Sequence, residues 1–163
     1  MYIQEITDEY RDRVNQILME EWHCPPSISR GKAIDTIRLP GLLFIEKDVI
    51  KGVITYHIEN EECEVVTLNS FEENRGIGTA LIEGVITIAR EKKCTRLWLI
   101  TTNDDINAIR FYQKKGLDLK AAHINAMDVS RKLKPSIPLI GMDHIPIKHE
   151  LEFEILLEQK NIE

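Results

Sequence analysis

Glu73-Asn74-Arg75-Gly76-Ile77-Gly78-Thr79 is the stretch of this sequence that decides its fold. It stands between a predicted strand, over Glu62 to Asn69, and a predicted helix that runs to about Lys92. Its two glycines let backbone N–H groups approach a ligand without an obstructing Cβ atom, and the first N–H groups of a helix are unsatisfied donors that attract phosphate. Arg75 adds a guanidinium that can bind phosphate through two hydrogen bonds. The segment predicts a phosphate-binding turn, although two glycines at a helix start also occur as a simple cap.

This turn differs from two better-known phosphate-binding motifs. The P-loop requires Gly-Lys followed by Ser or Thr, and the dinucleotide-binding fingerprint requires Gly or Ala where Leu81 stands. A nucleotide-binding α/β protein that holds ATP or NAD is therefore only a minor alternative.

Composition and charge limit the classes of protein to consider. The 163 residues, of which 43% are hydrophobic and 29% charged, fit a single compact domain over residues 1–163. A net charge of -6 argues against a nucleic-acid partner, because broad phosphate neutralisation needs a basic surface. The sequence shows no signal peptide and no apolar run near the roughly 20 residues of a membrane span. We therefore expect a cytoplasmic protein with no membrane partner.

Cysteine and histidine spacing gives no sign of a metal site, and we expect none. Cys24, Cys63 and Cys94 are odd in number and form no C-x-x-C pair, which favours buried or half-exposed thiols. The histidines lack ligand spacing such as H-E-x-x-H. We expect them at the surface or hydrogen-bonded in the core: His23, His57, His123, His144 and His149.

The first half of the chain predicts a strand, a helix and an antiparallel meander. A short strand around Tyr2 to Ile6 precedes a helix that buries apolar residues at spacings of three and four and ends near Cys24. Residues 27–41 are expected to form a long, partly structured loop that faces a substrate. Three strands follow, linked by short polar turns: Leu42 to Glu46, Ile50 to Ile58 and Glu62 to Asn69.

The second half alternates strands and helices. Its predicted strands are Arg96 to Thr101, Leu117 to Ala122 and Glu150 to Leu156, the last with alternating acidic and apolar residues. Its predicted helices are Ile106 to Lys115, closed by Gly116, and Ala126 to Leu133. The strand, helix, strand order after Glu62 indicates a crossover unit, whose ligand crevice lies at the carboxyl ends of the strands.

A second motif, Asn107-Ala108-Ile109-Arg110-Phe111-Tyr112-Gln113-Lys114-Lys115-Gly116-Leu117, follows the turn by about thirty residues. Together the two segments resemble the GNAT superfamily of acyl-CoA-dependent N-acetyltransferases. The first family motif reads Gln or Arg, two variable residues, Gly, one variable residue, then Gly or Ala, and the second resembles N-x-x-A-x-x-F-Y-x-x-x-G-F. The resemblance spans at least Glu64 to Leu117. It implies an α/β fold with a mixed central sheet of about six or seven strands, an antiparallel N-terminal meander, splayed strands around the CoA site and helices on both faces.

The match departs from the family pattern at the turn. Glu73 occupies the place where the family usually carries Gln or Arg, and an ionised carboxylate cannot donate a hydrogen bond to phosphate. Asn74 replaces a frequent glycine, and in the second motif Leu117 replaces Phe. Backbone donors do not depend on side-chain identity, and we expect Arg75 to compensate.

The resemblance implies acetyl transfer from acetyl-CoA, as co-substrate, to a primary amine by direct attack, with no metal. A lysine-like amine of pKa near 10.4 is neutral only about one time in a thousand at neutral pH, so a group must take its proton. Glu62 and Glu64 are the implied candidates, acting directly or through water, and both fit equally well as solvated charges beside a hairpin. Tyr112 matches the family's general acid, which protonates the departing thiolate. Its other interpretation is a core aromatic residue.

The implied CoA contacts lie on two strands, the turn and the second motif. Acetyl-CoA is expected between Val65 to Asn69 and Leu97 to Thr101, with its pantetheine arm bound by backbone N–H groups in the manner of another strand. Asn107 is expected to bind the pantetheine arm or to cap its helix. The expected cofactor-binding residues are Val66, Thr67, Leu68, Asn74, Arg75, Gly76, Ile77, Gly78, Thr79, Asn103, Asn107 and Phe111.

The acceptor is expected to approach from the opposite side, bordered by residues 27–41 and the segment after Ala122. A small amine, a peptide N-terminus and a lysine side chain all stay open as partners, as does a homodimer. The acidic net charge gives a weak preference for a cationic amine. The alternative function is a catalytically inactive CoA-binding sensor or interaction module of the same fold.

Overall fold

The structure is a computed structural model that describes residues 1–22 and 26–158. Backbone contacts divide the chain into two compact units. The first comprises residues 1–25, 35–97 and 156–163, and the second comprises residues 26–34 and 98–155. No helix in the described ranges is long and apolar enough to cross a membrane.

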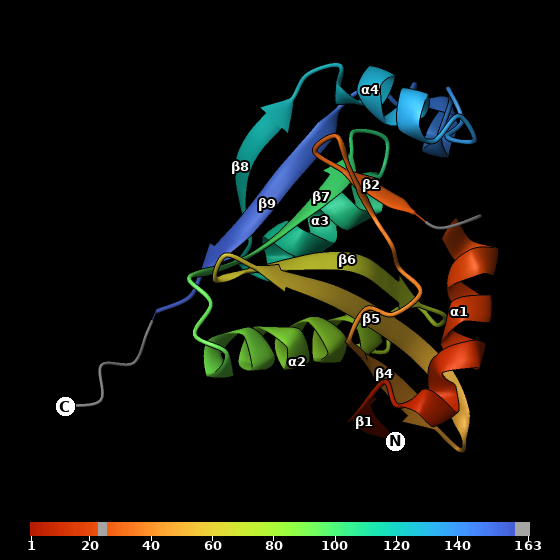
Figure 1. The fold of residues 1–163 in the computed structure, drawn as a ribbon, viewed down its shortest axis with the longest axis vertical. Helices are drawn as coiled ribbons and strands as arrows, with labels where there is room; N and C mark the ends of the chain where they lie inside the picture. Colours follow the sequence, from red (N-terminus) through yellow and green to blue (C-terminus); the bar gives the residue numbers. More distant parts are fainter. Residues whose placement is uncertain (23–25, 159–163) are drawn as a thin grey trace. The chain divides into compact units, whose positions relative to one another are not determined.

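The first unit is built on an antiparallel meander whose strands follow the order β1-β4-β5-β6 (Figure 1). Both hairpin turns of the meander have two central residues with positive φ: 50° and 61° at residues 47 and 48, and 52° and 60° at residues 60 and 61. Such turns match the right-handed twist of the strands they join. The predicted meander is confirmed, with strands β1 (Tyr2–Glu5), β4 (Gly41–Glu46), β5 (Val49–Glu59) and β6 (Glu62–Ser70).

Two helices pack on opposite faces of this meander (Figure 1). Helix α1 (Asp8–Trp22) contributes Val14, Ile17 and Leu18 to an apolar cluster with alternate residues of β4 and β5. Helix α2 (Ile77–Glu91) lies on the other face, where Gly84 approaches the side chain of Leu42. Alternate side chains of β4 therefore pack on different helices, as the period of a strand requires.

Gly52 of β5 lies directly beneath the first turn of α2. A Cβ atom at this position would stand 2.6 Å from Cγ2 of Ile77 and 2.9 Å from Cδ1 of Leu81. Both side chains are almost fully buried. The absence of a side chain at residue 52 thus sets how closely the helix start approaches the sheet.

The second unit contains a hairpin that the sequence did not predict. Residues 27–34, expected to be part of a long loop, form the strands β2 (Ser27–Ser29) and β3 (Lys32–Ile34). Arg30 and Gly31 link them with φ values of 49° and 73°, which is the turn that a two-residue hairpin favours. The strands have only three residues each, too short to give a clear alternating pattern in the sequence.

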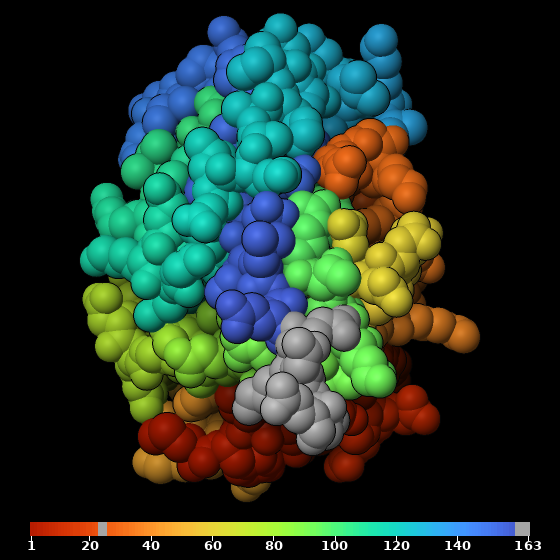
Figure 2. All heavy atoms as spheres, turned by 90° about the vertical axis from the view of Figure 1, so that its left-hand side faces the viewer, coloured from red at the N-terminus to blue at the C-terminus, as the bar shows by residue number. Residues whose placement is uncertain are grey.

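The remaining strands follow the order β7-β9-β8, and β7 begins in the first unit and ends in the second. β8 and β9 pair antiparallel, and Figure 2 shows their atoms next to each other at the surface. All seven strands belong by their hydrogen bonds to one mixed sheet, which confirms the predicted fold class. These elements are β7 (Arg96–Thr102), α3 (Ile106–Lys114), β8 (Asp118–His123), α4 (Ala126–Leu133), the short 3-10 helix η1 (Met142–His144) and β9 (Glu150–Leu156).

We expect Gly52→Ala to lower the free energy of unfolding by about 1 to 3 kcal/mol, because the added methyl group must displace Ile77 and Leu81 from a filled core. Urea denaturation measures this change. Val49→Ala, at an exposed position of the same strand, is the control and should change the free energy by less than about 0.5 kcal/mol. Equal stability of Gly52→Ala and the wild type would contradict the close contact.

Candidate functional site

The predicted phosphate-binding turn is formed at the start of α2. Gly76 is the N-cap residue in the left-handed conformation, with φ of 74°, and no side chain caps the helix. The first hydrogen bond of the helix runs from the N–H of Ala80 to the carbonyl of Gly76, at 2.9 Å. The N–H groups of residues 77 to 79 precede this bond, so the helix itself does not use them. They are the donors that the sequence predicted for phosphate.

Asn74 has a φ of 58°, in the left-handed region. Asparagine is one of the few residues other than glycine that adopts this conformation readily. Asn74 can therefore form the turn at a position where the GNAT superfamily frequently has glycine. Glu73 is exposed beside it.

Arg75 binds two carboxylates of its own unit. Its guanidinium donates to both oxygens of Glu46, at 2.9 and 3.0 Å, and also to Glu72. Glu72 in turn accepts from the ammonium group of Lys51. The hydrogen bond from Arg75 lowers the pKa of Glu46, and the bonds from Lys51 and Arg75 lower the pKa of Glu72. The role of Arg75 in binding phosphate stays a prediction, but its side chain already fixes the shape of the turn.

A β-bulge interrupts β6 where the pantetheine contacts were predicted. The pairing with β5 passes from Tyr56 opposite Val65 to Thr55 opposite Thr67, so Val66 is an extra residue. A bulged residue is left out of the regular ladder, and the strand bends there. The hydroxyl groups of Thr55 and Thr67 are hydrogen-bonded at 2.6 Å in the core. The hydroxyl of Thr67 is therefore used within the core. A ligand at Val66 to Leu68 would bind through the backbone N–H and carbonyl groups.

The two carboxylates predicted as proton acceptors differ in their surroundings. Glu62 receives two hydrogen bonds from the guanidinium of Arg96, at 2.9 and 3.4 Å. Glu64 is 7% exposed and faces His57 across the hairpin. Glu62 is therefore held in an ion pair within its unit, while Glu64 is a buried carboxylate. Their catalytic roles stay predictions.

Helix α3 carries the second motif and is capped by Asp105. The carboxylate of Asp105 accepts from the N–H of Ala108 at 3.0 Å. Asn107 is the second helical residue and is exposed, so the alternative that it caps the helix is wrong: the cap lies two residues earlier. The Asn107 amide is exposed near the helix start, and its contact with the pantetheine arm stays a prediction.

Tyr112 lies half-buried on α3 in an aromatic group. Its ring meets Phe111 edge to face at 5.4 Å between centroids and lies 6.4 Å from the ring of Phe153 on β9. Burial, and then the charge of Asp105, raise the pKa of Tyr112. The phenol is therefore protonated well beyond neutral pH, which is the state a proton donor needs.

Asn103, a predicted CoA ligand, uses its side chain within the second unit. The amide oxygen accepts from the N–H groups of Lys148 and His149, at 2.9 Å each, and the amide nitrogen donates to the carbonyl of Pro146 at 2.9 Å. The neighbouring carboxylate of Asp104 accepts from the N–H of Met142 at 3.1 Å. The end of β7 thus fixes the long segment between α4 and β9, whatever else Asn103 binds.

A group of polar residues around β9 was not predicted as a site. Glu150 and Glu152 are 1% and 4% exposed, on the same face of the strand. Glu150 accepts from the N–H of Arg30 at 3.1 Å and from the hydroxyl of Ser130 at 3.0 Å. Glu152 lies 3.0 Å from Nε2 of His123 and 3.7 Å from Nε of Arg30. The sequence showed that acidic and apolar residues alternate along β9. It did not show that the acidic side chains Glu150 and Glu152 are buried.

The other histidines and the cysteines have structural surroundings. His149 accepts from the N–H of Asn125 at 2.9 Å, and His57 lies 3.6 Å from Glu59 at the surface. Cys63 and Cys94 are free and buried, and burial raises the pKa of Cys63 to about 12. His23 and Cys24 lie outside the described residues. Within the part of the chain that the structure describes, no group of three or more His, Cys, Asp or Glu side chains is arranged to hold a metal ion.

Comparison with known proteins agrees with this geometry. The family model of the Acetyltransferase (GNAT) family matches residues 5–117. The chain is 39% identical over 142 residues to the uncharacterised protein YxbD of Bacillus subtilis, covering 86% of this chain and 89% of that protein. The first helix, strands β4 to β6 of the meander, the turn and the second motif all lie inside the region that the family model matches.

Solved structures share the fold. An IAA acetyltransferase from Bacillus cereus superposes with a TM-score of 0.73 at 15% identity, covering 96% of this chain and 99% of that one. A GNAT family acetyltransferase from Elizabethkingia anophelis, with acetyl-CoA bound, gives 0.69 at 20% identity, covering 96% and 97%. With the family match over residues 5–117, the turn at Gly76 and the motif at Asn107 to Leu117, the chain belongs to the GNAT family of acetyltransferases.

Proposed function

We propose that this protein is an N-acetyltransferase that moves the acetyl group of acetyl-CoA to a primary amine by direct attack. The observation that carries the proposal is the turn at Gly76, where the N–H groups of residues 77 to 79 are left unused by the helix. Such donors at a helix start suit the pyrophosphate of CoA. The acetyl-CoA bound to the fold neighbour from Elizabethkingia anophelis is consistent with this ligand.

The proposed reaction requires one proton acceptor and one proton donor. The acceptor ammonium loses a proton, and the neutral nitrogen attacks the thioester carbonyl to give a tetrahedral intermediate. Collapse of this intermediate breaks the C–S bond, releases the second nitrogen proton to solvent and expels the CoA thiolate, which takes a proton from the Tyr112 hydroxyl. A phenol of ordinary pKa about 10 is a weaker acid than a thiol of pKa about 8.5, and burial raises the pKa of Tyr112 further. The proton transfer itself is therefore uphill, and it is completed when solvent returns a proton to the phenolate.

We expect the purified protein to release free thiol from acetyl-CoA in the presence of some members of an amine panel. The panel comprises alkyl diamines, amino sugars, lysine-containing peptides and peptides with free N-termini, and a thiol reagent follows the release. Mass spectrometry of the acceptor should show one added acetyl group. CoA binding without turnover on any acceptor would favour the inactive sensor, and tight ATP or NAD binding that CoA cannot displace would favour a nucleotide-binding protein.

We expect Arg75→Ala to weaken CoA binding about tenfold, which corresponds to about 1.4 kcal/mol. Removing the guanidinium takes the bound cation from Glu46 and leaves Glu72 with Lys51 alone, which adds negative charge beside the proposed phosphate site. The loss should therefore shrink as salt screens this charge. Isothermal titration with CoA at two salt concentrations measures both effects. Lys51→Ala removes the other cation bound to Glu72 but lies on β5, and its effect should be smaller. Unchanged affinity in Arg75→Ala would show that backbone donors suffice.

We expect Tyr112→Phe to lower kcat by about 100-fold, because phenylalanine keeps the packing on Phe111 and Phe153 but cannot donate a proton. Since its pKa is raised, Tyr112 should cause no loss of wild-type activity below about pH 10. Steady-state kinetics from pH 6 to pH 10 check both points. Tyr56→Phe, a buried tyrosine on β5, is the control and should keep kcat. Equal kcat in Tyr112→Phe and the wild type would contradict the role of the phenol.

A further inference from the structure

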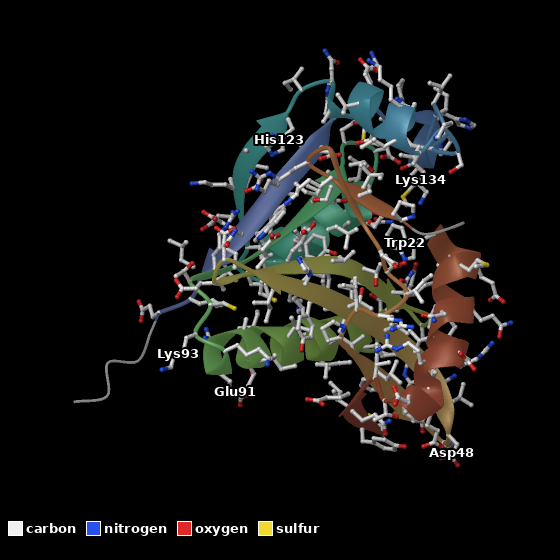
Figure 3. All side chains as sticks on the ribbon, in the orientation of Figure 1. Trp22, Asp48, Glu91, Lys93, His123 and Lys134 are labelled. Atoms are coloured by element: carbon white, nitrogen blue, oxygen red, sulfur yellow. The ribbon has the colours of Figure 1, made fainter. Side chains whose placement is uncertain are left out.

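His123 and Glu152 form a close imidazole–carboxylate pair in the second unit. His123 lies at the end of β8, where Figure 3 labels it. Its Nε2 is 3.0 Å from Oε1 of Glu152 on β9. The glutamate side chain is 6% exposed, whereas the histidine side chain is 33% exposed. The pair therefore has a buried carboxylate on the inside and an imidazole that reaches solvent.

The pairing determines which ring nitrogen can act as a base. An ionised carboxylate only accepts hydrogen bonds, so the tautomer of His123 that suits the contact carries its proton on Nε2. The lone pair is then on Nδ1, which has no hydrogen-bond partner among residues 1–22 and 26–158. A carboxylate that fixes the tautomer and leaves the other nitrogen as base is the arrangement that hydrolases use to activate a nucleophile.

Side chains from three further elements lie around the pair. Glu150 and Glu152 come from β9, and Arg30 comes from the turn between β2 and β3. Arg30 stands 3.7 Å from Glu152 and 5.3 Å over the ring of Trp98, while α4 contributes the uncharged hydroxyl of Ser130.

The other histidines of known surroundings lack this combination. His57 and Glu59 are 3.6 Å apart, and their side chains are 41% and 57% exposed, so solvent screens the pair. In His149 the Nδ1 lone pair is taken by the N–H of Asn125. His123 is distinguished by a buried orienting carboxylate together with an unused ring nitrogen.

The pair lies on the face of β9 opposite to Tyr112. Phe153 packs against Tyr112, and its neighbour Glu152 points to the other face of β9, because successive side chains of a strand alternate. Arg30 and His123 come from residues 27–41 and from the end of β8, segments that the sequence predicted to border the acceptor. The proposed proton donor to the thiolate and the imidazole thus belong to opposite faces of β9.

We propose that His123, oriented by Glu152, takes the proton of the acceptor ammonium group. The inference rests on the proposed acetyltransferase function. The N–H bond of the ammonium breaks and its proton passes to Nδ1 of His123, which frees the nitrogen lone pair for attack on the thioester. After acetyl transfer the imidazolium returns the proton to solvent. Glu152 is a positioning residue, and a cationic alkyl amine is the acceptor class that needs this step.

The test compares two acceptors that differ in whether they need a base. An alkyl amine from the panel is protonated at pH 7, whereas aniline is already neutral. In His123→Gln we expect about 100-fold lower kcat/KM with the alkyl amine, loss of the acid limb of its pH profile, and nearly unchanged kcat/KM with aniline. His57→Gln, which removes the histidine of the exposed pair, should behave as the wild type with both acceptors.

Glu152→Gln gives a second measurement that keeps the imidazole in place. It should lower kcat with the alkyl amine, because the imidazole loses the carboxylate that orients it, whereas Glu152→Asp should restore part of the rate. Equal losses with both acceptors, an unchanged acid limb in His123→Gln, or an acid limb that disappears in Glu64→Gln instead would overturn the assignment. A wild type that binds CoA but acetylates no amine would overturn the proposed function and this inference with it.

Discussion

The close contact between Gly52 of β5 and the first turn of α2 is the constraint on which the phosphate-binding turn depends. No side chain separates the strand from Ile77 and Leu81, so the helix start is held against the sheet by two buried residues. β5 also has a bulge beside this contact, because Phe44 pairs with Gly52 but Ile45 pairs with Ile50. The bulged Lys51 accepts a hydrogen bond from the N–H of Phe71 and binds Glu72, so strand and turn are connected on both sides of the contact.

The second unit depends on buried acidic side chains that bind backbone groups. Asp104 accepts from the N–H of Met142, and Gly141 packs so closely on its carboxylate that a Cβ atom there would stand 2.1 Å from Oδ2. Glu150 accepts from the N–H of Arg30 in the same way. A buried carboxylate is stable when its oxygens are hydrogen-bonded, so each of these residues fixes a segment distant in sequence. Hydrogen bonds to these buried carboxylates hold the long irregular segments of the second unit in a defined conformation.

The sequence predicted well those features that depend on local patterns. The meander followed from alternation and turn residues, α4 and β9 had the predicted bounds, and two motifs were enough to identify the family. The hairpin at Arg30 was missed because its strands are short, and α3 is capped by Asp105 and not by Asn107. The pairs of Arg75 with Glu46 and of His123 with Glu152 join residues 29 positions apart. No pattern in one sequence specifies which side chains meet at that distance.

The hairpin formed by β2 and β3 is attached to Glu150 through the backbone N–H of Arg30 and not through its guanidinium. Any residue other than proline supplies that N–H. The anchoring of the hairpin is therefore separable from the identity of its tip residue, whose side chain lies beside Glu152 and Trp98. Among residues that tolerate its φ of 49°, a substitution at position 30 changes the size and charge beside Glu152 and Trp98 while the hydrogen bond that holds the hairpin stays the same.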